Sequence, residues 1–225
     1  MRHELSIDGF IITSDNSAAI GEKPQDVVYA PDAVTAKFAA RVALLEQWAA
    51  GSEPLALLLH NFSGADQWDA YMAGIAELFA EAQMPLPPIS GSTETNMPTQ
   101  QSGIAVTLIG KQHRKQTPAE SLQWFVYGVP LVGKDVLAKQ GQTADLGLIK
   151  KAFESALIER IWPVGSKGIA HEVALLMGRP VEVATALDMN SSGGPATCVL
   201  VGVMPENAER AQHYFGENLF LMKFE

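Results

Sequence analysis

Several features that mark large classes of protein are missing from this sequence of 225 residues. It has one cysteine, Cys198, which excludes an internal disulfide and a cysteine-based zinc cluster and fits a reducing compartment. Asp and Glu outnumber Lys and Arg by 25 to 16, and the net charge of -9 argues against a nucleic-acid partner. No apolar run approaches the ~20 residues that span a bilayer, and no signal-peptide pattern opens the chain. We therefore expect a soluble cytoplasmic protein that does not enter a membrane.

The short motifs of common enzyme classes are also missing. There is no Gly-x-x-x-x-Gly-Lys-Ser/Thr phosphate loop, no Gly-x-Gly-x-x-Gly after a strand, no Gly-x-Ser-x-Gly elbow and no His-Glu-x-x-His. The five histidines are scattered, and Cys198 lies in an apolar strand-like segment. These absences disfavour nucleophilic and zinc mechanisms. They leave nucleotides open, because an acidic protein binds those through a metal ion and backbone amides.

What the sequence does contain is an alternation of strand-like and helix-like segments, and 47% of its residues are hydrophobic. Polar residues 111–121 predict a surface loop that separates two α/β domains, 1–120 and 121–225. The first domain is predicted to contain strands at 7–15, 54–62 and 103–110, helices at 31–51 and 64–83, and loops at 16–26 and 85–102. The second is predicted to contain strands at 122–133, 181–187, 196–203 and 218–224, and helices at 143–161, 169–178 and 206–215.

Acidic residues near the ends of these elements are the main candidates for chemistry. Asp15 ends the first strand, Glu46 lies near the end of the first helix, Glu94 lies in the 85–102 loop, and Asp26 is a fourth candidate. Carboxylates from separate elements can converge on Mg²⁺, which prefers oxygen ligands and bridges phosphates to a protein. Taken singly, each acid is more often a solvated charge, a helix cap or part of an ion pair.

Two glycine loops could offer backbone amides to an anion. Residues 163–172 run from a glycine loop directly into a helix, so that amides, helix N-terminus and Lys167 face one direction. Residues 191–195, Ser-Ser-Gly-Gly-Pro, precede a strand. Both loops are also compatible with ordinary tight turns, which are much more common than anion sites.

The order of these motifs resembles the superfamily of aminoimidazole ribonucleotide (AIR) synthetase, selenophosphate synthetase and thiamine-monophosphate kinase. The matching segments are "SDNSAAIGEK", "LLEQWAAGSEP", "SGSTETNMPTQQSGIAVTLIG", "GVPLVGKDVL", "PVGSKGIAHEVALL" and "SSGGPATCVLVGV". The residues of these segments are most similar to those of AIR-synthetase-related proteins such as α-ribazole kinases. The resemblance covers nearly the whole chain.

This resemblance implies an N-terminal α/β domain with a small mixed sheet, through which the protein dimerises, and a C-terminal α/β domain. It implies a Mg²⁺-dependent, ATP-binding phosphotransferase or synthetase for a small ribosyl- or cofactor-precursor metabolite, with ATP near the dimer interface. The metal ligands would be Asp15, Glu46 and Glu94. The nucleotide or substrate contacts would be Lys23, Asn61, Gly91, Ser92, Thr93, Gly165, Ser166, Lys167 and Gly168.

The sequence also departs from the family pattern. Glu46 and Glu94 stand where Asp is usual, and the Asp expected before the second glycine loop is replaced around Pro163 and Ser166. The second domain is shortened, and the reactive N-terminal cysteine of the selenophosphate branch is missing. The alternative hypothesis is therefore a non-catalytic relative that binds a nucleotide or phosphometabolite as a regulatory or assembly subunit.

Overall fold

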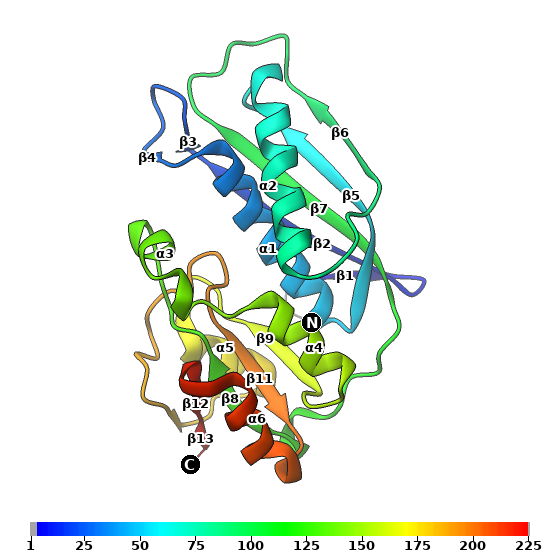
Figure 1. Ribbon diagram of the computed structural model, residues 1–225, viewed down its shortest axis with the longest axis vertical. Coiled ribbons are helices and arrows are strands. Elements are labelled where there is room, and N and C mark those ends of the chain that lie inside the picture. The colour runs from blue at the N-terminus through cyan, green and yellow to red at the C-terminus, as the bar shows by residue number, and fades with distance from the viewer. Residues whose placement is uncertain (1–3, 225) are drawn as a thin grey trace. The chain divides into compact units, whose positions relative to one another are not determined.

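The computed structural model describes residues 4–224, which divide between Arg114 and Lys115 into two compact units (Figure 1). Unit 1 contains residues 4–114 and unit 2 contains residues 115–224 of the described chain. Each unit has its own sheet, its own helices and its own core. Within residues 4–224, no helix has both the length and the apolar composition that crossing a bilayer requires.

Unit 1 is a five-stranded mixed sheet with two helices packed on one face. The strand order is β1-β2-β7-β5-β6, and every neighbouring pair is antiparallel except β5 and β6, which are parallel. A separate parallel pair, β3 and β4, follows the end of β2. The elements are β1 (Leu5–Ile7), β2 (Phe10–Ala18), β3 (Ile20–Gly21), β4 (Val28–Tyr29), α1 (Asp32–Ala49), β5 (Ser52–Asn61), α2 (Trp68–Glu81), β6 (Ile89–Thr93) and β7 (Gly103–Gln112).

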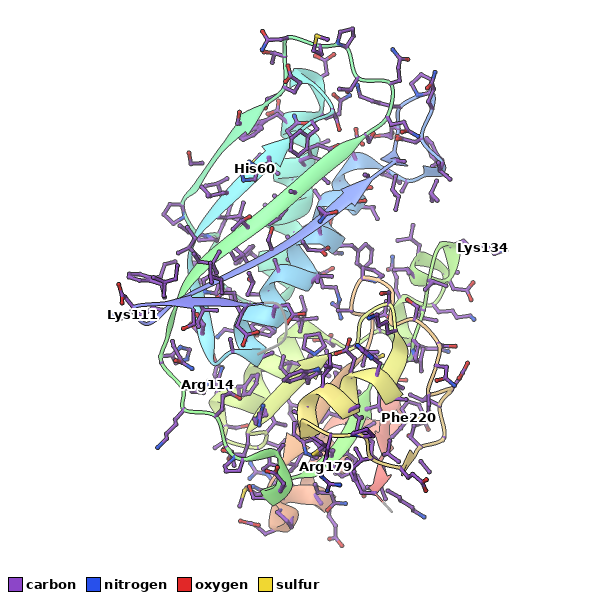
Figure 2. All side chains as sticks on the ribbon, turned by 180° about the vertical axis from the view of Figure 1, so that it is seen from behind. His60, Lys111, Arg114, Lys134, Arg179 and Phe220 are labelled. Carbon is purple, nitrogen blue, oxygen red and sulfur yellow. The ribbon has the colours of Figure 1, made fainter. Side chains whose placement is uncertain are left out.

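The period-two pattern of β7 explains why the sheet has one buried face. Ile104, Val106 and Leu108 are buried, and the residues between them are partly exposed. Alanines of α1 allow that helix to lie close to the sheet, where the Oγ1 of Thr13 donates to the carbonyl of Ala43 at 2.8 Å. The opposite face has no helix over it in either view (Figures 1 and 2).

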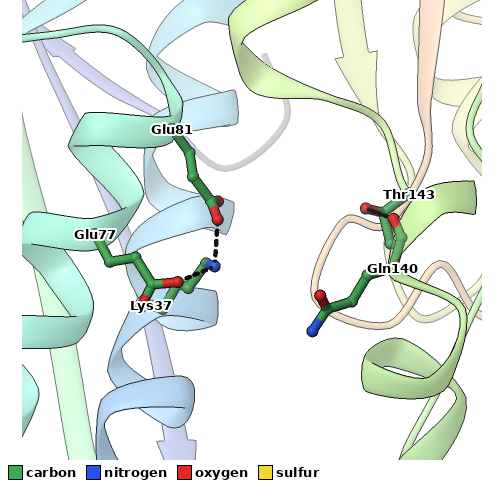
Figure 3. Close-up of polar contacts among 5 residues, drawn as sticks. All are labelled: Lys37, Glu77, Glu81, Gln140 and Thr143. Atoms are coloured by element: carbon green, nitrogen blue, oxygen red, sulfur yellow. Dashed lines mark hydrogen bonds and ion pairs between the residues drawn. The ribbon is translucent and has the colours of Figure 1, made fainter.

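Helices α1 and α2 are joined by a small ion-pair network at their surface. The Lys37 ammonium lies 2.8 Å from Glu77 and 2.5 Å from Glu81, so one lysine of α1 bridges two acids of α2 (Figure 3). The two glutamates are largely exposed, and pairs of this kind contribute little to stability. The apolar contact beneath them, which includes Leu44, Ile75 and Leu78, is fully buried.

Unit 2 is built on a four-stranded antiparallel sheet in the order β12-β8-β11-β9, with a small β10-β13 ladder beside it. Its core includes Trp124, Val126, Val173 and Leu200. The elements are β8 (Gln123–Tyr127), α3 (Lys134–Ala138), α4 (Leu146–Glu154), β9 (Arg160–Pro163), α5 (Gly168–Met177), β10 (Val183–Ala184), β11 (Val199–Val203), α6 (Ala208–Phe215), β12 (Leu219–Leu221) and β13 (Lys223–Phe224).

The predicted α/β fold class is confirmed, and most predicted elements are present, but five local predictions are wrong. The first strand, predicted to end at Asp15, continues to Ala18. Residues 85–102, predicted as loop, contain strand β6. The helix predicted over 143–161 ends at Glu154, and β9 begins at Arg160. The strand predicted over 181–187 is reduced to the two residues of β10, and helix α3 was not expected at all.

Candidate functional site

The first predicted metal ligand, Asp15, lies in the middle of β2. It pairs with Val106 of β7. Asp15 lies two residues after Thr13 on the same strand, so both side chains face the helix layer. Burial raises the pKa of Asp15 from 3.8 to about 6, and the backbone N–H of Asn16 opposes this rise only in part. Asp15 is thus a half-buried carboxyl that can change its protonation state near neutral pH.

The second predicted ligand, Glu46, is buried near the C-terminal end of α1 and is 3% exposed. Its neighbour Gln47 donates to the carbonyls of Ile11 and Leu108 at 2.9 and 3.0 Å, which places this turn over the start of β2. Gln47 of α1 bonds Ile11 of β2, and the earlier residue Ala43 bonds the later residue Thr13, so β2 and α1 run in opposite directions. Asp15 and Glu46 are therefore separated by about 11 Å along the sheet, from the rises of a strand and a helix.

The third predicted ligand, Glu94, follows β6 and folds back on its own loop. Its Oε1 accepts hydrogen bonds from the backbone N–H groups of Asn96 at 2.6 Å and Met97 at 3.2 Å. Asp15 of β2 pairs with Val106 of β7, Val106 pairs with Leu59 of β5, and Leu59 pairs with Gly91 of β6. Three steps between strands put β2 and β6 about 14 Å apart, and Glu94 lies further along.

The three acids consequently do not form one site. Over residues 4–224, no group of three or more His, Cys, Asp or Glu side chains is arranged to hold a metal ion. The expectation of a shared Mg²⁺ centre at Asp15, Glu46 and Glu94 is therefore not met, because the first faces the helix layer, the second is buried in helix packing and the third caps its own turn. This set does not fit a divalent cation, and we derive no chemical step through one.

A different polar cluster does form in unit 1, where the 16–26 loop meets the segment before β7. Lys23 donates from Nζ to the carbonyl of Thr99 at 2.8 Å and to its Oγ1 at 2.9 Å. Asp26 accepts from the backbone N–H and Oγ of Ser102, each at 2.7 Å, and from the N–H of Lys23 at 2.8 Å. Burial raises the pKa of Asp26, but these bonds and the Lys23 charge outweigh it and hold the pKa below its usual value.

Beside this cluster, Asp32 is a buried acid at the start of α1. It is 4% exposed, and its Oδ1 has no hydrogen-bond partner within residues 4–224. Burial, followed by the nearby Glu22 carboxylate, raises the pKa of Asp32. The Glu22 carboxylate also accepts from the Asp32 backbone N–H at 3.2 Å. The Lys23 charge thus acts on both Asp26 and Asp32, and Glu22 lies against Asp32.

Buried hydroxyls extend this cluster under the end of β5. The Oγ of Ser63 lies 2.6 Å from the hydroxyl of Tyr71, and it accepts from the N–H of Gly103 at 2.9 Å. The predicted contact residue Asn61 is 1% exposed. Its side chain donates to the carbonyl of Gly64 at 2.6 Å and accepts from the N–H of Ser63 at 2.8 Å. Asn61 therefore shapes the turn after β5.

The predicted contacts in the β6 region are strand residues. Gly91 pairs with Leu59, and a Cβ at Gly91 would lie 2.0 Å from the Leu59 carbonyl oxygen, so only glycine fits. Ser92 is exposed, and Thr93 is partly exposed opposite Asn61. Of these three residues, Ser92 is the one whose side chain is most accessible to a ligand.

The predicted contacts in unit 2 lie in the loop between β9 and α5. Glu172, 3% exposed, holds this loop through Oε1, which accepts from the N–H of Gly165 at 3.2 Å, while its Oε2 accepts from Trp162 Nε1 at 2.9 Å. The N–H of Gly168 donates to the Gly165 carbonyl at 3.2 Å, so two of the amides are already engaged. Ser166 and Lys167 point to solvent at the helix start.

An open hollow of about 470 Å³ lies in unit 1 next to the Lys23 cluster. It is formed where β2 ends and β7 begins. Its lining is Asn16, Ser17, Ala18, Phe62, Thr99, Gln101, Ser102, Gly103, Ile104 and Ala105.

Sequence reasoning missed most of the residues that meet here. Asp32 looked like an ordinary acid in the first turn of a helix, and Thr99 and Ser102 looked like loop residues. The one available signal was Lys23 and Asp26 in a single short loop, which named the loop but not its partners.

No protein-family model matches this sequence, and no curated protein matches it. Solved structures do match in fold. PurL of T. maritima complexed with AMPPCP aligns with a TM-score of 0.63 at 12% identity, over 98% of this chain and 41% of that one. HypE, a hydrogenase maturation protein, in complex with ATP aligns with a TM-score of 0.62 at 12% identity, over 97% of this chain and 78% of that one. Thiamine monophosphate kinase (ThiL) of Aquifex aeolicus aligns with a TM-score of 0.63 at 13% identity, over 96% of this chain and 85% of that one.

This chain thus spans less than half of the PurL chain but about four fifths of the HypE and ThiL chains. Identities of 12–13% establish the fold and do not single out a nearest member, so the similarity to α-ribazole kinases stays a prediction. The chain has a mixed α/β fold similar to the folds of HypE and ThiL.

Proposed function

We propose that this protein binds a nucleotide, with ATP as the leading candidate. The observation that carries the proposal is the fold, which is shared over 97–98% of this chain with structures solved in complex with ATP and with AMPPCP. The acidic composition is compatible with it, because nucleotides are commonly held through backbone amides and single cations. The catalytic hypothesis drawn from the sequence requires this binding step, and the non-catalytic one requires either it or the binding of a phosphometabolite.

Local support comes from the Lys23 cluster. An ammonium group has three N–H donors, and Thr99 accepts two of those of Lys23, so one donor remains for a phosphate oxygen. The half-buried position of Lys23 and its two fixed bonds hold the charge in one place. An anchored cation at the rim of a hollow is a suitable contact for one phosphate.

Phosphoryl transfer to a small ribosyl- or cofactor-precursor metabolite is the second candidate function. It is favoured by Asp15, whose pKa of about 6 suits a general base that accepts a proton from an acceptor hydroxyl. The dispersed positions of Glu46 and Glu94 favour a binding protein without catalysis instead. Transfer therefore ranks below binding.

A homodimer remains part of the proposal. Leu5 and Ile7 of β1 are exposed, and they pair with residues of β2 that alternate with the helix-facing Thr13, so they lie on the sheet face without helices. A second copy that covers this face would remove apolar surface from water. Light scattering coupled to size exclusion measures the mass directly, and a strictly monomeric protein at micromolar concentration contradicts the dimer.

The binding proposal is tested by thermal unfolding with ATP, with ATP and Mg²⁺, with ADP and without nucleotide. A ligand that binds the native state raises the melting temperature, and the shift keeps growing with the logarithm of the ligand concentration above the dissociation constant. No shift with any nucleotide at millimolar concentration refutes nucleotide binding. If ATP does shift the transition, Asp15→Asn separates the two functions: loss of ADP production with unchanged ATP binding supports transfer, and no ADP production by the wild type supports binding alone.

A further inference from the structure

The hollow beside Lys23 has an uncharged lining. None of its ten lining residues is Asp, Glu, Lys, Arg or His, although the chain as a whole is rich in acids. Its volume of about 470 Å³ lies within the range of small-molecule sites. A triphosphate would lose its hydration there without any compensating charge. The chemistry of the lining therefore suits a neutral group.

Phe62 gives this hollow a flat aromatic surface. Phe62 is 53% exposed, which is uncommon for phenylalanine, and because it follows the buried Asn61 it faces the opposite side of the sheet. A Cβ built at Gly103 would lie 3.2 Å from Cβ and 3.8 Å from Cδ2 of Phe62. The absence of a side chain at Gly103 thus lets the phenylalanine lie close over β7, where the backbone N–H of Phe62 donates to the Gly103 carbonyl at 2.9 Å.

Amide groups stand at the edge of the same hollow. Gln101 donates from Nε2 to the carbonyl of Gln25 at 2.8 Å, which fixes its orientation and leaves Oε1 as an acceptor. Asn16 is an exposed lining residue of β2, and its amide can both donate and accept. Such groups recognise the edge of a heterocycle while the ring stacks on an aromatic face.

We infer that this hollow, the Phe62 hollow, is the subsite for the uncharged planar base of a nucleoside or nucleotide. The inference rests on the proposed nucleotide binding and adds the part of the ligand that is recognised. Lining residue Thr99 is also the anchor of Lys23, so a ligand with its base on Phe62 has its phosphates on the charged side of the hollow. The base can belong to ATP or to an unphosphorylated nucleoside.

The test measures dissociation constants of ATP, adenosine and inorganic tripolyphosphate by titration calorimetry. The variants are Phe62→Ala, Phe62→Tyr and Phe10→Ala. Phe10 is a matched control, because it is 44% exposed on the same sheet but pairs with Lys111 at the opposite end of β2 and β7. Stacking on an aromatic side chain changes affinity by about fivefold or more on truncation to alanine.

We expect Phe62→Ala to raise the dissociation constants of ATP and adenosine by a similar factor and to leave that of tripolyphosphate unchanged. Phe62→Tyr and Phe10→Ala should bind all three probes as the wild type does. Adenosine binding that depends on Phe62, with no ATP binding, identifies a nucleoside as the source of the base and refutes ATP as the nucleotide.

Two results overturn the inference in distinguishable ways. Wild-type protein that binds neither ATP nor adenosine refutes the proposed function and the subsite together. ATP binding that Phe62→Ala leaves unchanged, or weakens equally for tripolyphosphate, refutes the subsite alone. Melting curves of each variant, compared with wild type, identify any loss of binding that comes from unfolding.

Discussion

Replacing Asp15 by asparagine should stabilise unit 1 in a pH-dependent way. Burial raises the pKa of Asp15 to about 6 in the folded protein, against 3.8 for an unperturbed carboxyl. The unfolded chain therefore ionises at lower pH than the folded one. As pH rises from about 4 to about 6, the unfolded state gains a favourable charge that the folded state resists, and stability falls. Asparagine cannot ionise, so it removes this loss.

The magnitude follows from the two pKa values. Each pKa unit corresponds to about 1.4 kcal/mol, so a difference of about 2 gives an upper limit of about 3 kcal/mol. Partial contact of Asp15 with solvent reduces this figure. We therefore expect Asp15→Asn to increase the free energy of unfolding by about 1–3 kcal/mol above pH 7. Near pH 4 the variant and wild type should be equally stable, because Asp15 is then protonated in the folded state.

Urea unfolding at pH values from 4.5 to 8 measures this difference, and hydrogen exchange of peptides from β2 assigns it to unit 1. Asp8→Asn is the control, since Asp8 is exposed in the β1–β2 turn and its positive φ of 49° suits asparagine as well as aspartate. A stability gain that does not change with pH, or a variant less stable than wild type above pH 7, would refute the reasoning.

Three further substitutions test other parts of the structure. Gly91→Ala should lower the melting temperature by several degrees, because its Cβ would lie 2.0 Å from the Leu59 carbonyl oxygen and would disrupt the β5–β6 ladder. Asp26→Ala removes three hydrogen-bond acceptor contacts and should speed hydrogen exchange in residues 23–30, measured by mass spectrometry. Glu172→Ala should cost about 1–3 kcal/mol in urea unfolding, because the buried Trp162 Nε1 loses its acceptor.

The fold class could be predicted from the sequence because most elements carry their own signal. The alternation of buried and partly exposed residues in β7, and the helix-forming segment of α1 between Pro31 and Gly51, are visible in one segment of chain. Strand β6 carries no such signal, since "ISGST" is short, polar and bounded by proline, and it becomes a strand only by pairing with β5. The end of α4 was missed for a related reason: Ala156 has a φ of 50°, a turn conformation that glycine usually marks.

The site could be predicted only in part, because convergence in space has no signature in a single sequence. Asp15 was predicted at the end of a strand but lies inside β2, and Glu94 was predicted in a loop but directly follows β6. The sheet order puts two strands between β2 and β6. Conversely, Asp26 and Ser102 are 76 residues apart and share two hydrogen bonds. Only the pairing of β2 with β7 brings those loops together.

The distribution of buried polar groups in unit 1 bears on where the proposed ligand would bind. Both ends of the helix-facing layer bury polar groups: Gln47 and Ser52 lie near the start of β5, and Asn61, Ser63 and Asp32 lie near its end. Burying polar groups costs free energy unless they are satisfied, and Asp32 Oδ1 has no partner among residues 4–224. A fold that served stability alone would replace such an acid with an apolar residue. Asp32 is the acid among the unpartnered groups of unit 1, and Lys23 and the hollow residue Ser102 lie beside it, so a polar atom of the proposed ligand would supply the missing partner.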